Sequence, residues 1–502
     1  MLNLMPIING KAVKRADLPV FEFEQFREKL LEISRYGYIV QFFGYEDDNK
    51  LFVLAVMRLE NQLLAGCARL PESYPSLTIK RPKFNLFERE LAEQFGVRPL
   101  GHPWLKMIRY QPNWRQRPDV FGNNYKEDIP GRYPYFKVEG EEIHEVAVGP
   151  VHAGIIEPGH FRFQCAGERV LHLEISHGYQ HRGIERLLIK SAPLRRPFIV
   201  ENIAGDTAMA NSISYSQAIE ALGGLTVSPE AMTVRTIALE LERLANHVGD
   251  LGAMSGDVAF TPPAAFFGRI RGEFLNLLLL LSGNRFGKGL IRPGGTVLPT
   301  GKMELAAIKA KINELRPEID HCIELLLTAH TVLSRFEQCG IVSREAAEGL
   351  GLVGPAGRAS WQSYDARRDF PVERYADLPP CPWEHPTGDV LARARIRAAE
   401  ISHSFDCLNI LLASGGRTET IIRPETHKLA PSAMVVTINE AWRGELSHCL
   451  LTDAEGKIIR YKVKDPSFHN WSGLAMALRD EEISDFPINN KSFNLSYCGM
   501  DL

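Results

Sequence analysis

A polar, proline-containing stretch divides this sequence into a shorter first part and a longer second part. The stretch from 109 to 142 contains four prolines among mainly polar residues: Pro112, Pro118, Pro130 and Pro134. Such segments form extended linkers because proline lacks an N–H group and restricts the backbone. The chain has 502 residues, too many for one ordinary core. We therefore expect a first domain at 1–108, a linker at 109–142 and a second domain at 143–502.

The first domain shows the pattern of a small α/β unit. Its first helix is predicted by apolar residues at helical spacing: Phe23, Phe26, Leu30 and Ile33. Two β-rich runs at 36–45 and 51–59 flank an acidic, turn-prone connection, which indicates a hairpin. A second helix is expected to follow Phe84 and to end at Gly96.

The second domain begins with β-like runs at 144–154 and 160–176 and then becomes mainly helical. Ser228 and Pro229 are typical of a helix start. Three long apolar helical faces follow one another along the chain: Ile237, Leu241, Leu244 and Val248; Ile308, Ile312, Leu315, Ile319 and Ile323; Ile401, Phe405, Leu408 and Leu412. Consecutive faces of this kind indicate a helical bundle.

The remainder of the second domain has weaker patterns. Pro317 is expected to kink the helix that contains it. The Gly- and Pro-rich segment 339–388 is expected to be a long surface or interface loop. Near the end, strands are predicted at 434–439 and 447–453, and a helix near 474–480. The fold class expected is α+β: a small α/β domain followed by a mainly helical bundle with flanking strands.

Composition excludes several classes of protein. The net charge is −3, so neither nucleic acid nor an anionic surface is indicated as a main partner. The N-terminus lacks the features of a signal peptide. The densest apolar run, Leu277 to Leu281, is far shorter than the roughly 20 residues that cross a bilayer. We expect a soluble, cytoplasmic chain that reaches the membrane only through partners.

The cysteines argue against a metal centre made by this chain alone. There are eight, none in a C-x-x-C pair: Cys67, Cys165, Cys322, Cys339, Cys381, Cys407, Cys449 and Cys498. Zinc and iron–sulfur sites usually require such pairs, so these residues are expected to be reduced and mostly buried.

A glycine pattern at Gly349, Gly351 and Gly354 matches G-x-G-x-x-G, which binds dinucleotides when a strand precedes it and a helix follows. Neither neighbour is clear here, and a flexible loop is the favoured interpretation. NADH use would then belong to other subunits.

Clusters of titratable residues mark candidate sites. A turn between two predicted strands contains His152, Glu157, His160 and Arg162. Such a cluster is often structural, although a carboxylate beside a histidine can also transfer protons. Further on, the segment HRGIERL contains His181, and its Arg182 and Glu185 would pair if both lay on one helix.

The segment ALELERLANHVGDLGA contains five ionisable residues: Glu240, Glu242, Arg243, His247 and Asp250. A solvated helix face is the default interpretation for so many charges. Because the neighbouring residues are strongly apolar, the alternative is that some of these charges are buried and paired. Later segments supply further polar residues: Arg443 and Glu445; Asp465, Ser467, His469 and Asn470.

Taken together, these segments resemble a known family. YPSLTIKRPKFNLFERELAEQFGVRPLGHPWL in the first domain is similar to the 30-kDa subunit of complex I. In the second domain, GPVHAGIIEPGHFRF, YQHRGIERL, LELERLANHVGDLGA, IRPGGT, EAWRGEL and NKSFNLSY resemble the 49-kDa subunit and the large subunit of group 4 membrane-bound nickel–iron hydrogenases. The fusion is most similar to the large subunits of formate hydrogenlyase and hydrogenase-4.

The resemblance also shows a departure. Those hydrogenases hold nickel and iron with two C-x-x-C pairs, and Ala204, Thr207, Ser467 and Asn470 stand at the four cysteine positions here. Methyl, hydroxyl and amide groups do not replace thiolate ligands. The resemblance therefore implies a hydrogenase-like cavity with no metal and no hydrogen chemistry.

Residue roles follow from the resemblance alone. Glu157 matches the glutamate that passes protons from the hydrogenase active site, and Arg443 and Asp465 match positions beside the lost metal. The implied cavity is lined by Glu157, His160, Asp206, Arg443, Asp465 and His469, with His152 and His181 as further binding residues. Complex I binds a quinone head group in the equivalent cavity, although this chain has the hydrogenase-like EPGH form at the first turn.

Two hypotheses from different classes remain. The chain is either a catalytic-core subunit of a membrane-bound energy-converting oxidoreductase, or a redox-inactive scaffold within it. The implied partners are a small iron–sulfur subunit resembling the complex I 20-kDa subunit, a ferredoxin-like iron–sulfur subunit and antiporter-like membrane subunits. The complex would lie on the inner face of the cell membrane, and a quinone is the candidate ligand. An active hydrogenase is the third hypothesis, and it requires bound nickel.

Overall fold

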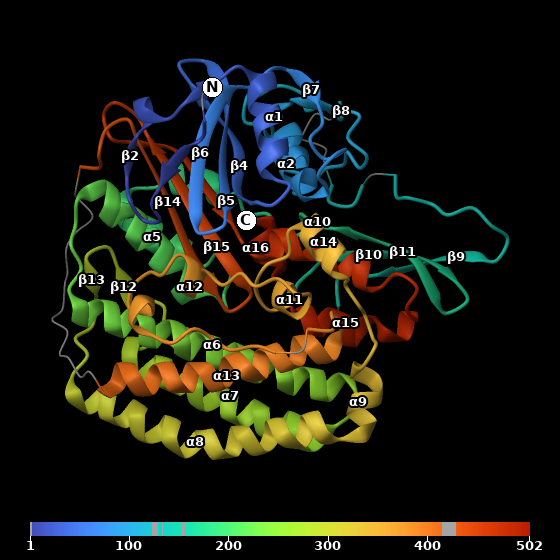
Figure 1. Ribbon diagram of the computed structural model, residues 1–502, viewed down its shortest axis with the longest axis vertical. Helices are drawn as coiled ribbons and strands as arrows, with labels where there is room; N and C mark the ends of the chain where they lie inside the picture. Colours follow the sequence, from blue (N-terminus) through green and yellow to red (C-terminus); the bar gives the residue numbers. More distant parts are fainter. Residues whose placement is uncertain (1–2, 123–128, 133, 153–155, 385, 414–427) are drawn as a thin grey trace.

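The computed structural model describes residues 3–122, 129–132, 134–152, 156–384, 386–413 and 428–502. Three layers follow one another along the long axis in Figure 1. A sheet from the first domain lies at the top, a sheet from the C-terminal part lies in the middle, and long helices lie at the base. This mixed architecture confirms the expected α+β class.

The first layer is a five-stranded sheet covered by two helices. Its strands are β1 (Met5–Ile7), β3 (Val20–Phe21), β4 (Tyr38–Asp47), β5 (Lys50–Leu59) and β6 (Gln62–Arg69). The helices are α1 (Phe23–Ile33) and α2 (Asn85–Phe95). The predicted hairpin is β4–β5, and Gly96 ends α2 at φ 65°, a conformation that glycine adopts without strain. These predictions are confirmed.

The middle layer is a four-stranded sheet in the order β16–β15–β14–β2. Its strands are β2 (Val13–Lys14), β14 (Ala433–Ala441), β15 (Gly444–Thr452) and β16 (Ile458–Lys464). It packs against the first sheet through apolar side chains such as Phe43, Leu54 and Val436. Helix α5 (Ala208–Gly223) covers its other face, where Asn439 Nδ2 donates to Ala210 O at 2.9 Å. Both faces are therefore buried.

A smaller sheet projects at the right of Figure 1. It consists of β9 (Ile143–Val148), β10 (His160–Ala166) and β11 (Arg169–Ser176), as the β-like runs predicted. Short helices α3 (Ile184–Lys190) and α4 (Arg196–Val200) follow. Two minor strand pairs complete the sheets: β7 (Ser73–Pro75) with β8 (Arg98–Leu100), and β12 (Ile291–Arg292) with β13 (Gly295–Thr296).

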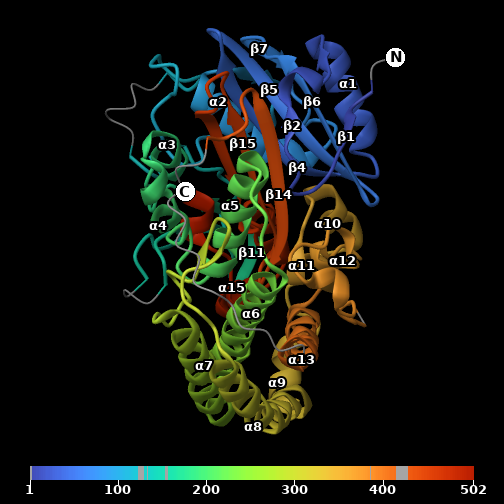
Figure 2. The same ribbon diagram turned by 90° about the vertical axis from the view of Figure 1, so that its left-hand side faces the viewer.

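The base is a bundle of four long helices, shown from two sides in Figures 1 and 2. They are α6 (Pro229–Asp257), α7 (Thr261–Ser282), α8 (Lys302–Thr328) and α13 (Val390–Ala413). Ser228 caps α6 by accepting from Ala231 N at 3.2 Å, as predicted. Helix α8 continues on both sides of Pro317. Within the described ranges, no helix is long and apolar enough to cross a membrane.

The prediction of a long loop at 339–388 is wrong. After α9 (His330–Phe336), this segment forms α10 (Arg344–Leu350), α11 (Gly354–Ala359) and α12 (Ala366–Asp369), and many of its residues are buried. Two glycines of this segment have structural roles: one ends a helix and the other allows two backbone segments to pack closely. Gly351 ends α10 at φ 75°, and a Cβ atom on Gly354 would lie 2.1 Å from Arg443 O. A helix, not a strand, precedes this glycine pattern.

The C-terminal part adds three helices beside the middle sheet: α14 (Ser467–Ala477), α15 (Phe486–Phe493) and α16 (Tyr497–Asp501). The helix predicted near 474–480 therefore begins earlier, directly after Asp465 and Pro466. This earlier start places Ser467 and Asn470 in its first turn.

Candidate functional site

The four positions where the hydrogenase-like family would carry cysteine lie at two helix starts. Ala204 and Thr207 precede α5, and Ser467 and Asn470 lie in the first turn of α14; all four are at most 1% exposed. Ser467 Oγ accepts from Ser496 N at 2.9 Å, and Asn470 bonds both the N and the O of Val353 at 3.0 Å. Their polar atoms are thus engaged within the protein.

An ion pair lies beside Thr207. Arg443 donates from both Nη atoms to the Asp206 carboxylate at 2.8 and 2.7 Å, and from Nε to Asn494 O at 2.6 Å. Arg443 Nη1 also lies 3.2 Å from Thr207 Oγ1, and the guanidinium stacks 3.8 Å from the Trp442 ring centroid. Burial alone would raise the pKa of Asp206, but Arg443 outweighs it and the pKa is lowered. Asp206 is therefore an ionised carboxylate with one third of its side chain exposed.

Asp465 lies near this pair but in a different protonation environment. Its Oδ1 accepts from Ser467 N at 2.8 Å, whereas the buried Oδ2 has no hydrogen-bond partner among the described residues. Burial raises the pKa of Asp465, and Arg443 opposes this shift only in part. A Cβ atom on Gly499 would lie 2.5 Å from Oδ2, so any larger residue there would force the carboxyl or α16 to shift. Asp206 and Asp465 thus have pKa values shifted in opposite directions.

The loop between β9 and β10 brings Glu157 to the C-terminal segment. Glu157 Oε2 accepts from the backbone N–H groups of Tyr497 and Cys498 at 3.0 and 3.4 Å. His160 Nδ1 lies 3.2 Å from Gly149 O, and Arg162 Nε donates to His160 Nε2 at 3.1 Å. Because arginine only donates, His160 is neutral with its proton on Nδ1. Burial lowers its pKa, in agreement with this assignment.

The remaining histidines have separate positions. His152 Nε2 lies 2.9 Å from Gly159 O within the same loop. His181 Nδ1 lies 2.7 Å from Asp501 O, and burial lowers its pKa. His469 Nε2 lies 3.2 Å from Lys464 Nζ, and its ring packs against Phe87 of the first domain. These contacts connect His469 with the domain interface and not with the Asp206–Arg443 pair.

The pairing expected between Arg182 and Glu185 is wrong. Gly183 adopts φ 67° and α3 starts only at Ile184, so Arg182 lies outside the helix. Arg182 Nη2 donates to Ile203 O at 2.8 Å and to Cys498 O at 3.1 Å. Glu185 instead lies 2.9 Å from both Lys462 and Arg460.

Sequence reasoning missed the role of the C-terminal segment 494–501. Asn494 O accepts from Arg443, Ser496 N donates to Ser467, and Cys498 N donates to Glu157. This segment therefore connects the helix starts, the ion pair and the β9–β10 loop. The family-like stretch NKSFNLSY was the available signal. Burial, followed by Glu157, raises the pKa of the Cys498 thiol to about 12, so it is protonated at neutral pH.

Helix α6 lies next to the start of α5 and contains several buried charged residues. Arg243 Nε pairs with Glu240 at 3.2 Å, His247 Nε2 with Glu400 at 3.0 Å, and Asp250 with Arg397 at 2.8 Å. The default interpretation of a solvated helix face is thus wrong, and the alternative of buried, paired charges is confirmed for Glu240, Arg243, His247 and Asp250. Glu242 accepts from Met209 N at 2.7 Å and thereby fixes the start of α5. Burial raises the pKa of Glu242 to about 8.

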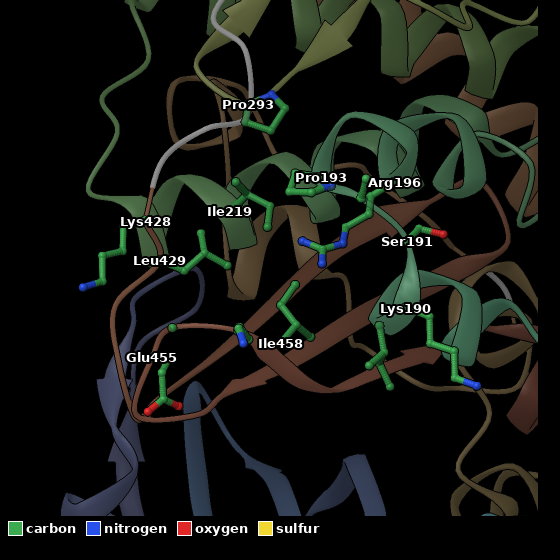
Figure 3. A pocket seen from close by; sticks show the side chains of 14 residues that line it. Lys190, Ser191, Pro193, Arg196, Ile219, Pro293, Lys428, Leu429, Glu455 and Ile458 are labelled. Carbon is green, nitrogen blue, oxygen red and sulfur yellow. The ribbon is translucent and has the colours of Figure 1, made fainter.

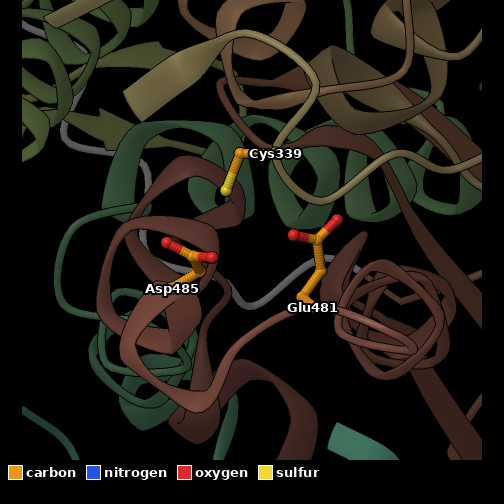
Figure 4. Close-up of side chains that lie close together, drawn as sticks. All are labelled: Cys339, Glu481 and Asp485. Carbon is orange, nitrogen blue, oxygen red and sulfur yellow. The ribbon is translucent and has the colours of Figure 1, made fainter. Parts of the chain in front are cut away.

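A separate cluster has donors of the type that bind metals. Figure 4 shows Cys339, Glu481 and Asp485, whose ligand atoms lie within 4.8 Å of one another. Asp485 is already paired with Arg335 at 2.8 Å. Burial, followed by the two carboxylates, raises the pKa of the Cys339 thiol to about 12. A thiol protonated at neutral pH is a poor ligand, so this cluster carries no assignment.

Comparison with known proteins places these features in a family. The family described as "Respiratory-chain NADH dehydrogenase, 49 Kd subunit" matches residues 257–431 and 419–501, and "Respiratory-chain NADH dehydrogenase, 30 Kd subunit" matches residues 28–125. Hydrogenase-4 component G of Escherichia coli is 27% identical over 438 residues, which cover 85% of this chain and 76% of the relative.

Two further relatives support the same grouping. Formate hydrogenlyase subunit 5 of Escherichia coli is 27% identical over 86% of this chain and 78% of its own length. An NADH-quinone oxidoreductase subunit of Herpetosiphon aurantiacus is 30% identical over 356 residues, 69% of this chain and 94% of the relative. The chain belongs to the family of the respiratory-chain NADH dehydrogenase 49 Kd subunit, and a domain of the 30 Kd family is fused before it.

Proposed function

We propose that this chain is a core subunit of a membrane-bound, complex I-like oxidoreductase, peripheral on the inner face of the membrane. Its relatives are subunits of NADH-quinone oxidoreductase and of group 4 hydrogenase complexes. In this proposal the site around Asp206, Arg443 and Asp465 couples protons to the reduction of an acceptor such as a quinone. Electrons arrive through iron–sulfur clusters of a small partner subunit and a ferredoxin-like subunit. Antiporter-like subunits form the membrane arm.

The residues at the former cysteine positions do not fit a nickel centre. Ala204 has only a methyl group, and the hydroxyl of Ser467 and the amide of Asn470 are hydrogen-bonded to neighbouring backbone. Nickel and iron in such a centre need soft thiolate ligands. The thiol of Cys498, near the site, has a raised pKa. We therefore derive no chemistry through a metal at this position.

The observation that carries the proposal is the contrast between Asp206 and Asp465. Asp206 is ionised beside Arg443, whereas Asp465 is buried with a raised pKa and with an oxygen that has no partner among the described residues. Two carboxyls with pKa values shifted apart are a common arrangement for proton transfer. A change of charge near Arg443 would alter its attraction for both carboxyls and thus the proton affinity of Asp465.

A quinone head group would need hydrogen-bond donors. Arg443 is a donor of suitable chemistry in this site, and Asp465, whose pKa burial raises, becomes a donor when it binds a proton. The partly exposed Asp206 marks the side open to a ligand or partner. Bound quinone would supply the two-electron acceptor. The chain's own contribution would be to orient it by Arg443 and to hold a proton at Asp465.

The test uses the purified complex with Asp465→Asn and Glu157→Gln. We expect a fall in quinone reduction and in protons taken up per electron, with normal assembly. Asp480→Asn is the control, because this carboxylate is exposed on the surface. If both variants assemble and behave as the unaltered complex does, the proton-coupling proposal fails.

The alternative is a redox-inactive scaffold that joins the small iron–sulfur subunit to the membrane arm. It is favoured by the engagement of Arg443 and Asn470 in internal hydrogen bonds. A scaffold predicts that Asp465→Asn changes neither electron transfer nor proton uptake. Elemental analysis decides the third hypothesis, since stoichiometric nickel in the complex would identify an active hydrogenase.

A further inference from the structure

A hollow lies away from the candidate site. It has a volume of about 580 Å³ and is bounded by the α3–α4 segment, Leu429 before β14, and the turn between β15 and β16. None of its lining residues belongs to the candidate site. Its size lies within the range of about 300–1,000 Å³ found for small-molecule sites.

Part of the wall of this hollow is apolar. Ile219 comes from α5, Leu429 precedes β14 and Ile458 begins β16, while Pro193 and Pro293 lie at its border (Figure 3). These side chains come from segments far apart in the sequence. They form a surface against which the hydrocarbon part of a ligand would be removed from water.

One cation points into this hollow. Figure 3 shows the Arg196 guanidinium extending toward its centre, between Ile219 and Ile458. Arg196 Nε donates to Leu188 O at 2.9 Å, which fixes the direction of the side chain. Among the described residues, the Arg196 side chain has this hydrogen bond and no ion pair. A guanidinium without an ion pair, positioned beside apolar side chains, is suited to bind a carboxylate or a phosphate.

The charged residues at the rim of the hollow also favour the binding of an anion. Lys190, Lys428 and Lys457 lie around the hollow, against one carboxylate, Glu455. In Figure 3, the side chains of Lys190 and Lys428 point away from the centre. They therefore contribute a positive potential that attracts anions, while Arg196 is the group positioned to bind one.

We propose that this hollow binds an anionic amphiphile. Its carboxylate or phosphate head contacts Arg196, and its apolar body packs against Ile219, Leu429 and Ile458. The two sources of such chemistry are a free fatty acid and an anionic membrane lipid. The same segment exposes Leu194 and Phe198, at 62% and 58%, which are residues suited to contact with a lipid surface.

The first test measures binding to the full-length chain by calorimetry with decanoate, decanol and decyltrimethylammonium. Decanoate is expected to bind once per chain and at least about tenfold more tightly than the other two, because only it offers a charge-assisted bond to Arg196. Acetate is expected to bind far more weakly, since it lacks the apolar body. Equal binding of decanol and decanoate, or of acetate and decanoate, would overturn the proposal.

The second test uses variants. Arg196→Gln should weaken decanoate binding by about tenfold or more, whereas Arg195→Gln, its exposed neighbour outside the hollow, should leave it unchanged. Arg196→Lys retains the positive charge and should give an intermediate affinity. Thermal unfolding of each variant establishes that it is folded. Unchanged binding in a folded Arg196→Gln variant would contradict the assignment.

A third measurement distinguishes the two sources. Vesicles of phosphatidylcholine with and without phosphatidylglycerol are sedimented with the chain and with Arg196→Gln. Retention that requires both phosphatidylglycerol and Arg196 identifies a membrane lipid. Decanoate binding without vesicle retention identifies a free amphiphile. The absence of both overturns the proposal.

Discussion

The domain interface and the candidate site both contain buried carboxyl groups, but the two regions differ in how these groups are paired with cations. At the interface, Lys462 lies 2.6 Å from Glu90 of the first domain and 2.9 Å from Glu185 of the second, and Arg460 also pairs with Glu185. At the candidate site, Asp465 has no ion pair with a described residue and one oxygen without a partner. Glu90 also has one buried oxygen without a hydrogen-bond partner, so the difference between the two regions lies in the ion pairs. Ion pairs are typical of a structural network, and the proposed proton-binding role of Asp465 rests on its having none with a described residue.

The pKa values of Glu185 at the interface and Asp465 at the candidate site also differ in the direction of their shift. Burial alone would raise the pKa of Glu185, but Lys462, Arg460 and Arg109 outweigh it and the pKa is strongly lowered. For Asp465, burial dominates and the pKa is raised. The comparison teaches that burial alone does not determine the pKa of these two carboxyls: several adjacent cations outweigh burial at Glu185, whereas Arg443 offsets it only in part at Asp465.

The largest expected effect comes from breaking the interface network. Lys462→Met leaves Glu90 and Glu185 buried with fewer cations, and we expect a loss of about 3–5 kcal/mol in the free energy of unfolding. Denaturant unfolding of the full chain measures it. The matched control is Lys311→Met, which removes an exposed pair with Glu314 and should change stability little. A small loss with Lys462→Met would show that this network is not structural.

The second largest expected effect comes from filling the space next to Asp465 with a larger side chain at position 499. Gly499→Ala would place a Cβ atom 2.5 Å from Asp465 Oδ2, so either α16 or the carboxyl must shift. We expect a destabilisation of about 1–3 kcal/mol, as for other overpacked positions. Gly256→Ala in α6 is the control, because no atom lies within 4 Å of its added Cβ and alanine favours helices. Equal stability of both variants would mean that Asp465 has free space around it.

Local chemistry explains which parts of the fold were predictable. The Ser228 cap, the Gly96 helix end and the β4–β5 hairpin depend on neighbouring residues, and the structure contains all three. Strand β16 was not predicted. Its alternating Arg460, Lys462 and Lys464 have the pattern of a solvated strand, yet these side chains are buried because their acidic partners lie elsewhere in the chain.

The candidate site was predictable only in part, for the same reason. That Ala204, Thr207, Ser467 and Asn470 stand where hydrogenases have cysteine was inferred from residue identities and the family resemblance, and it stays a prediction. The connection of Arg443 with Asn494, and of Glu157 with Cys498, depends on how the C-terminal segment packs. No spacing rule contains that information, because the contact between residues 157 and 498 joins opposite parts of the second domain.

The smallest expected effect is also the most direct test of the comparison: the pH dependence of stability. The folded-state pKa of Glu185 is lowered, so its contribution is present above the unfolded value and is lost as pH falls through the folded pKa. The folded-state pKa of Asp465 is raised, so its contribution is present below the unfolded value and is lost as pH rises through the folded pKa. Glu185→Gln should therefore remove stability mainly toward neutral pH.

Asp465→Asn should do the opposite. This variant removes a carboxyl that becomes costly when ionised, so its stability relative to the unaltered chain should increase as pH rises above about 3.9, the ordinary value for aspartate. Urea unfolding of both variants across a pH series measures the two slopes. Slopes of the same sign would mean that Asp465 is ionised and paired like the interface carboxylates. The distinction between a structural network and a proton-binding site would then be lost.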